Sequence, residues 1–140
     1  MLVGYIRVST DDQNLNLQKD ALIKYGIDQR NIFSDKTSGS KDKRVGLDKA
    51  IEFLKDGDTL VVWKLDRLGR SLAHLISIIT SLKNRNISFI SITEGMDTTT
   101  ASGELFFHIF GALAQFERSL IQERVKAGLE SAKQRGITGG

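Results

Sequence analysis

The sequence contains no cysteine and no proline among its 140 residues. Without cysteine the chain can form no disulfide framework, no thiolate zinc site and no thiol nucleophile, and its composition suits a reducing cytosol. Long apolar runs are also missing, because the run from Leu2 to Val8 is short and is interrupted by Gly4 and Arg7. It fits neither a signal peptide nor a membrane span. We therefore expect a soluble, cytoplasmic protein that has no membrane partner.

The length and the charge balance narrow the class of protein further. A chain of 140 residues allows one compact domain with its own core and, at most, an appendage. The formal net charge is +3 and the pI is near 9.3. This balance favours an anionic partner such as nucleic acid, although it is also common in domains that bind none.

The apolar patterning predicts an α/β fold. Apolar runs predict strands at residues 2–8, 32–33, 59–63 and 87–92. Helical spacing predicts helices over residues 10–25, 46–55 and 71–83, the first opened by a capping box at Thr10–Gln13 and stopped by Gly26. Because strands and helices alternate along the chain, we expect a mostly parallel open sheet wrapped by helices.

A long helix is predicted from Ser102 to Gln134, where apolar residues keep helical spacing and no proline intervenes. At about 1.5 Å per residue it would reach roughly 50 Å, farther than a domain of this size extends. We expect the stripe from Leu105 to Phe116 to be buried within the same domain, and the stripe from Leu120 to Leu129 to project and pack on another chain. Residues 1–101 would then form an α/β body and residues 102–135 an oligomerisation helix.

Two polar clusters follow predicted strands, where α/β proteins place chemistry. Ser9 comes two residues after Arg7 at the end of the first strand, and Arg67 and Arg70 follow the third. A serine among arginines suits a nucleophile that attacks a phosphate whose charge the guanidinium groups hold. Each residue also has a structural explanation: Ser9 could cap the next helix, and Asp66 and Arg67 could form a local ion pair.

Six separated motifs resemble the catalytic domain of serine site-specific recombinases, most closely that of DNA invertases. They fall in order along essentially the whole chain, at Tyr5–Thr10, Leu17–Gln18, Asp35–Gly39, Arg44–Leu47, Lys64–Arg70 and Glu117–Arg124. The resemblance implies a site-specific recombinase that cleaves and rejoins DNA strands, by inversion or by resolution.

The resemblance also implies the catalytic residues. Ser9 would attack a DNA phosphodiester, form a 5′-phosphoserine bond and free a 3′ hydroxyl, with rejoining as the reverse attack. Arg7, Arg67 and Arg70 would offset the charge on the phosphoryl oxygens, and Arg44 could join them from a loop. Because transesterification keeps the ester energy in the protein–DNA bond, neither ATP nor a metal nor another cofactor is expected.

Further positions match the family in supporting roles. Asp66 would lie close to the arginines and would either orient them or exchange protons. The remaining supporting or DNA-binding positions are Gln18, Asp35, Ser38, Arg118, Glu123 and Arg124. Residues 136–140 correspond to the start of a linker, which in the family leads to a C-terminal helix-turn-helix that this sequence does not include.

The partners implied by the resemblance are a double-stranded DNA recombination site and further copies of the chain. We expect a homodimer, and a tetramer in the synaptic complex. An accessory DNA-bending or enhancer-binding protein is a possible further partner, which the sequence does not decide. Such proteins come from bacteria, phages or mobile elements and would be associated with the nucleoid.

Two other functions remain open at this point. The chain could be a non-catalytic, DNA-associated oligomerisation module built on the long helix. A metal-dependent nuclease or phosphatase would need clustered carboxylates, and Asp11, Asp12 and Asp66 are a thin basis for one.

Overall fold

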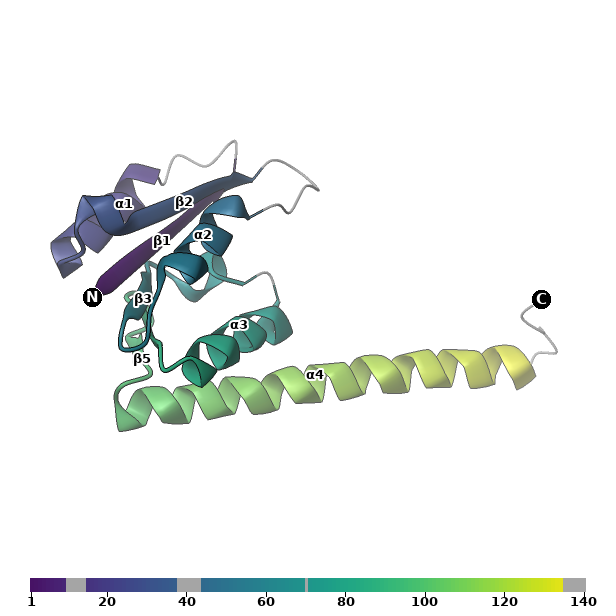
Figure 1. Ribbon diagram of the computed structural model, residues 1–140. Helices are drawn as coiled ribbons and strands as arrows, with labels where there is room; N and C mark the ends of the chain where they lie inside the picture. Colours follow the sequence, from purple (N-terminus) through teal and green to yellow (C-terminus); the bar gives the residue numbers. More distant parts are fainter. Residues whose placement is uncertain (10–14, 38–43, 70, 135–140) are drawn as a thin grey trace.

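The fold is seen in a computed structural model, which describes residues 1–9, 15–37, 44–69 and 71–134 (Figure 1). Of these, the side chains of residues 9, 37 and 130–134 are outside the description. The predicted capping box at Thr10–Gln13 therefore lies outside the described residues.

The sheet has five strands in the order β2-β1-β3-β4-β5. The strands are β1 (Leu2–Ser9), β2 (Ile32–Thr37), β3 (Thr59–Val62), β4 (Ser88–Ser91) and β5 (Met96–Asp97). The first four run parallel, and β5 is antiparallel to β4. The predicted parallel sheet is confirmed. The short strand β5 was not predicted, because two residues are too few to form a recognisable pattern.

Helices cover both faces of this sheet. They are α1 (Leu15–Tyr25), α2 (Val45–Phe53), α3 (Leu72–Asn84) and α4 (Ala101–Gln134), with short 3-10 turns η1 (Gln29–Asn31) and η2 (Leu65–Arg67). The core between the sheet and α1 is built on Ile6, Val8 and Leu22. The larger core on the other face includes Tyr5 from β1 and takes residues from α2, α3 and α4. Successive residues of β1 thus feed two different cores, as the alternation of a strand requires.

The helix ends follow the expected chemistry. Gly26 ends α1. Its φ of 116° is a positive-φ conformation, which glycine adopts more easily than other residues. Ser71 caps α3 by accepting from the His74 amide at 3.1 Å. Thr100 does the same for α4 through the Gly103 amide at 3.0 Å.

The long helix α4 is confirmed, but the face that it turns to the body is not the predicted one. Leu105, Ile109, Leu113 and Phe116 are 45–61% exposed, so the expectation that this stripe is buried within the domain is wrong. The buried residues of this half are Gly103, Phe107 and Ala114, with Phe110 partly buried. The physical reason is close approach: a Cβ at position 103 would lie 1.7 Å from the Asp97 carbonyl oxygen.

The body-facing side of α4 remains apolar beyond the body. Ile121 follows Phe107 and Ala114 at steps of seven residues, close to two helical turns, and therefore lies on the same side. The helix continues well past α3, where the body no longer covers it (Figure 1). Ile121, Val125 and Leu129 are 59–67% exposed. This half of α4 thus carries an apolar face that nothing in the described chain covers. None of the described helices is both long and apolar enough to cross a membrane.

Candidate active site

The carboxyl ends of the parallel strands bring the predicted catalytic segments together. Strand β1 ends in Arg7, Val8 and Ser9, and β3 pairs with it in parallel, so that Tyr5 lies opposite Val62. Beyond Val62 the chain enters η2, which carries Asp66 and Arg67. Both segments therefore emerge at the same edge of the sheet, where open α/β folds bind their ligands.

The guanidinium groups of Arg7 and Arg67 each donate to a backbone carbonyl of the segment that carries the other arginine. The Arg7 guanidinium donates through Nη2 to the carbonyl oxygen of Asp66. In return, Arg67 donates through Nη1 to the carbonyl oxygen of Arg7 at 3.3 Å. These two contacts fix the orientation of η2 relative to the end of β1, and they place two guanidinium groups at one point of the sheet edge.

Arg44 adds a third guanidinium to the cluster. It is the residue that precedes α2, is only 8% exposed, and donates through Nη1 to the carbonyl oxygen of Leu68. The contact ties the start of α2 to the segment that follows η2. Because arginine stays protonated even when buried, this position carries positive charge towards the cluster at any physiological pH.

Asp66 contributes more through its backbone than through its carboxylate. The carboxylate lies 3.6 Å from Arg67 Nε, which confirms the local ion pair considered from the sequence, but its side chain is 71% exposed. An exposed pair at that distance stabilises the fold little. The carboxylate is therefore accessible to a ligand at the site edge, whereas the Asp66 carbonyl orients Arg7.

Asp35, on β2, connects the start of α2 with β1. Its carboxylate accepts from the amides of Gly46 and Leu47 at 2.7 and 2.9 Å and so holds the start of α2, next to Arg44. It also accepts from the Tyr5 hydroxyl at 2.8 Å. Burial raises the pKa of Tyr5 above its ordinary value, and the bond to Asp35 raises it further. The sequence marks Tyr5 only as part of a motif. The further signal that it carries is a tyrosine in a buried strand, because the hydroxyl of such a residue needs a hydrogen-bond partner.

Gln18 reaches the cluster from α1. It is fully buried and donates through Nε2 to the Arg7 carbonyl oxygen at 3.2 Å. Its Oε1 and the Nε of Arg7 are buried and have no hydrogen-bond partner among the described residues. Buried polar atoms without partners are rare in folded proteins. The buried surroundings of Gln18 and Arg7 thus contain one donor and one acceptor that are unpaired among the described residues.

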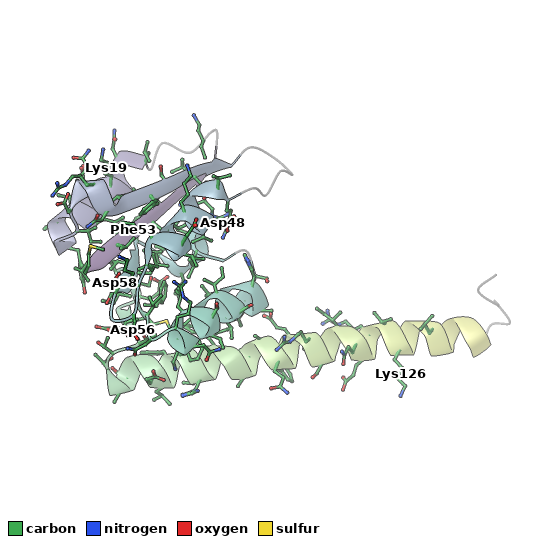
Figure 2. The ribbon with its side chains drawn as sticks, in the orientation of Figure 1. Lys19, Asp48, Phe53, Asp56, Asp58 and Lys126 are labelled. Carbon is green, nitrogen blue, oxygen red and sulfur yellow. The ribbon has the colours of Figure 1, made fainter. Side chains whose placement is uncertain are left out.

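The other predicted site residues either lie on α4, away from this cluster, or are not among the residues that the structure describes. Arg118, Glu123 and Arg124 are exposed on α4, whose second half runs past the body. Figure 2 shows the nearby Lys126 side chain pointing away from the helix on that projecting half. Ser38 and Arg70 lie outside the described residues, as does the side chain of Ser9, which is the last residue of β1.

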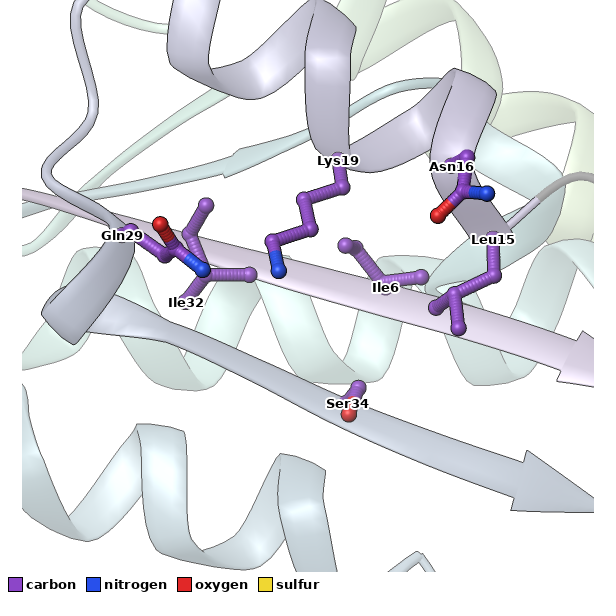
Figure 3. Close-up of a pocket in the computed structure, with 7 residues that line it drawn as sticks. All are labelled: Ile6, Leu15, Asn16, Lys19, Gln29, Ile32 and Ser34. Atoms are coloured by element: carbon purple, nitrogen blue, oxygen red, sulfur yellow. The ribbon is translucent and has the colours of Figure 1, made fainter.

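Two further features bear on where a ligand could bind. Among the described residues no three His, Cys, Asp or Glu side chains group in a way that could hold a metal ion. A cavity of about 230 Å³ lies between α1 and the strands β1 and β2, and Lys19 extends from α1 across it towards Ile6 and Ile32 (Figure 3). It shares no lining residue with the arginine cluster. We therefore place the candidate active site at the cluster.

The chain is similar to known proteins over nearly its whole length. The family model described as "Resolvase, N terminal domain" matches residues 2–138. The chain is 54% identical to the serine recombinase gin of Escherichia phage Mu, over 140 residues that make up 100% of this chain and 72% of the phage protein. It is 55% identical to the transposon Tn552 DNA-invertase BinR of Staphylococcus aureus, covering 100% of this chain and 73% of the relative.

Solved structures agree in fold. The N-terminal catalytic domain of TP901-1 integrase superposes with a TM-score of 0.72 at 34% identity, covering 85% of this chain and 97% of that one. A resolvase family site-specific recombinase from Streptococcus pneumoniae superposes with a TM-score of 0.73 over 95% of this chain and 97% of its own, and at 23% identity it supports the fold alone. With a family match over nearly its whole length and relatives at this identity, the chain belongs to the resolvase family of serine recombinases and is a site-specific recombinase.

Proposed function

We propose that this chain cuts and rejoins double-stranded DNA through a covalent bond between Ser9 and a 5′ phosphate. The observation that carries the proposal is the convergence of Arg7, Arg44 and Arg67 at the sheet edge where β1 ends in Ser9. A serine nucleophile at the end of a strand, close to guanidinium groups, suits the attack on a phosphodiester. The family relationship supports the same chemistry.

The reaction exchanges one ester for another. The Ser9 hydroxyl oxygen bonds to phosphorus, the bond from phosphorus to the 3′ oxygen breaks, and the proton lost by Ser9 is balanced by one gained at the 3′ oxygen. Rejoining is the same exchange in reverse, with a 3′ hydroxyl of the new partner strand as the nucleophile. Since each step conserves the number of phosphate ester bonds, the cycle needs no nucleotide hydrolysis.

Several arginines would bind the phosphate together. Arg7 is held through Nη2 by the Asp66 carbonyl, so its positive charge is already oriented at the sheet edge where the phosphate would bind. Arg67 and Arg44 bring two further positive charges, and Arg70 is assigned to the same group by its motif. Charge that develops on the non-bridging oxygens is stabilised by such prearranged donors. Asp66, exposed at the edge, orients guanidinium groups or exchanges protons.

The long helix makes the assembly. We assign residues 1–101 to the catalytic body, residues 102–135 to oligomerisation and residues 136–140 to the start of a linker. Two apolar faces of α4 are exposed, one through Leu113 and Phe116 and one through Ile121 and Val125, and contiguous exposed apolar surface is typical of protein–protein interfaces. Burying them between two chains gives a dimer, and two DNA-bound dimers would join as a tetramer.

The positions exposed on the second half of α4 then have a role in DNA binding. Arg118 and Arg124 are proposed to contact DNA phosphates, with Glu123 in a supporting role. An accessory DNA-bending or enhancer-binding protein is compatible with this assembly, and we place the protein with the DNA of the nucleoid.

The test is covalent capture. Purified protein is incubated with DNA that carries its recombination site and a nick that releases the cleaved end, and the products are separated under denaturing conditions. The proposal predicts protein bound to the 5′ end and a free 3′ hydroxyl that a polymerase can extend. Cleavage that leaves no protein on the DNA, or leaves it on the 3′ end, would contradict the proposal. Dimerisation without any cleavage would favour the non-catalytic module.

A further inference from the structure

The turn that carries Asp66 and Arg67 is capped by a distant carboxylate. In η2, the residue before the turn, Lys64, makes no side-chain cap. The first amide of such a turn has no acceptor within the turn itself. Here the Leu65 amide points at Glu94, which lies 29 residues later in the chain, with 3.3 Å to each carboxylate oxygen.

Glu94 is itself held in place by the loop between β4 and β5. Ser91, fully buried at the end of β4, donates its hydroxyl to the carboxylate. Glu94 sits in a tight turn closed by the Gly95 amide on the Ile92 carbonyl at 3.2 Å, with Gly95 in the left-handed conformation at φ 68°. A left-handed glycine after such a turn is a common way to close a short hairpin. The bond from Ser91 and the geometry of the turn therefore restrain the orientation of the Glu94 carboxylate.

The same loop is also joined to the residue where β3 leads into η2. Thr93 donates twice to the Trp63 carbonyl, from its amide at 2.9 Å and from its hydroxyl at 2.6 Å. Trp63 in turn stacks against Arg67, whose guanidinium carbon lies 5.8 Å from the ring centre. The contacts of Thr93 and Glu94 thus hold the chain on both sides of Lys64, immediately before Asp66 and Arg67.

We propose that Glu94 is a positioning residue for recombination, which acts by fixing the turn that presents Arg67 to the phosphate. The inference rests on the proposed role of Arg67. Without the carboxylate the Leu65 amide loses its acceptor, and the turn is free to rotate away from the carbonyl of Arg7. Glu94 contacts the Leu65 amide and the Ser91 hydroxyl, so we assign it no contact with the DNA phosphate. Its loss should therefore slow the chemical step and leave DNA binding unchanged.

The contacts to the Leu65 amide are long, so the expected effect is moderate. Glu94→Gln keeps the size of the side chain but leaves a single acceptor oxygen and no charge, and the cleavage rate of pre-bound DNA should fall about tenfold. Glu94→Asp keeps the carboxylate and should recover part of the rate. Glu52→Gln, at an exposed position of α2, is the matched control and should cleave at the unchanged rate. Ser91→Ala frees the carboxylate without removing it and gives a second, milder variant if Glu94→Gln folds poorly.

Trp63 gives a direct readout of the turn. It is the only tryptophan of the sequence, and both Lys64 and Arg67 lie over its ring. In the folded Glu94→Gln protein, acrylamide should quench the Trp63 fluorescence more strongly than in the wild type, while circular dichroism stays the same. Unchanged quenching together with an unchanged cleavage rate would overturn the inference.

A double-mutant cycle with Arg67→Lys separates this inference from the proposed function. If Glu94 acts through Arg67, Glu94→Gln should slow the Arg67→Lys protein by less than twofold, compared with about tenfold in the wild type. If Glu94→Gln slows the Arg67→Lys protein as much as it slows the wild type, Glu94 does not act through Arg67 and the inference is wrong. If Arg67→Lys alone cleaves at the wild-type rate, the proposed role of Arg67 is wrong, and the Glu94 inference falls with it.

Discussion

The Nη1 of Arg67 donates to the backbone carbonyl of Arg7 at 3.3 Å, across 60 residues of sequence. Arg7 returns a bond to the carbonyl of Asp66, next to Arg67. The two arginines therefore depend on each other for orientation, and both depend on the parallel pairing of β1 with β3. A site of this kind forms only when β1 and β3 have paired, since each arginine is held by a carbonyl of the other segment.

Replacing Arg67 by lysine tests the use of its guanidinium. Lysine keeps the charge but not the planar set of donors, so it cannot bond the Arg7 carbonyl and a phosphoryl oxygen in the same geometry. We expect Arg67→Lys to slow cleavage roughly a hundredfold or more, with DNA affinity little changed. Rates of cleavage on pre-bound DNA measure this. Arg30→Lys, at an exposed arginine of η1, is the control, and equal rates for both variants would leave Arg67 a structural role only.

The buried hydroxyl of Tyr5 predicts a loss of stability at alkaline pH. Burial raises the pKa of Tyr5 above the ordinary value of 10.0, so the folded state disfavours its ionisation. The stabilisation by neutral Tyr5 is full below pH 10 and is lost as the pH rises from there through the raised pKa. The free energy of unfolding, measured with denaturant at neutral pH and at about pH 11, should fall more in the wild type than in Tyr5→Phe.

Tyr5→Phe also removes one donor from Asp35. At neutral pH the variant should lose about 1 kcal/mol of stability, because a buried hydrogen bond to a carboxylate is lost. An identical pH dependence of the two proteins would contradict the assignment of the alkaline loss to Tyr5.

Ile121→Glu tests the projecting half of α4. Placing a carboxylate in a buried apolar interface costs roughly 2 kcal/mol or more, which would weaken a dimer about thirtyfold. Sedimentation should show the variant shifted towards monomer, and its cleavage activity should fall with the dimer. Ser119→Glu adds the same charge about 200° around the helix and is the control. If Ile121→Glu remains a fully active dimer, the interface lies on the other exposed face, through Leu113 and Phe116.

The sequence predicted the elements of this fold well where their apolar pattern was long. The sheet, the long helix and the helix stop at Gly26 all followed from local rules, since buried parallel strands and helix ends have local signatures. The buried face of α4 did not, because two apolar stripes share the helix and only the tight contact of Gly103 with Asp97 selects between them. Spacing alone cannot reveal such a tertiary contact.

The candidate site was predictable as a set of residue types but not as a set of bonds. Arg7, Arg44 and Arg67 could be named because strand ends and motifs mark them. Their acceptors are backbone carbonyl groups, which every residue has and which no sequence pattern distinguishes. The capping of Leu65 by Glu94 was missed for the same reason, since the two meet only after β3 and β4 have paired.

The identity of the nucleophile is the central claim, and mass spectrometry of the trapped complex tests it most directly. Covalent protein–DNA product is digested with protease and nuclease, and the peptide that retains a nucleotide is sequenced. The account predicts that the 5′ phosphate is attached to Ser9, and that Ser9→Ala folds and dimerises normally yet yields no attachment. A nucleotide found on any other residue, or attachment that persists in Ser9→Ala, would contradict it.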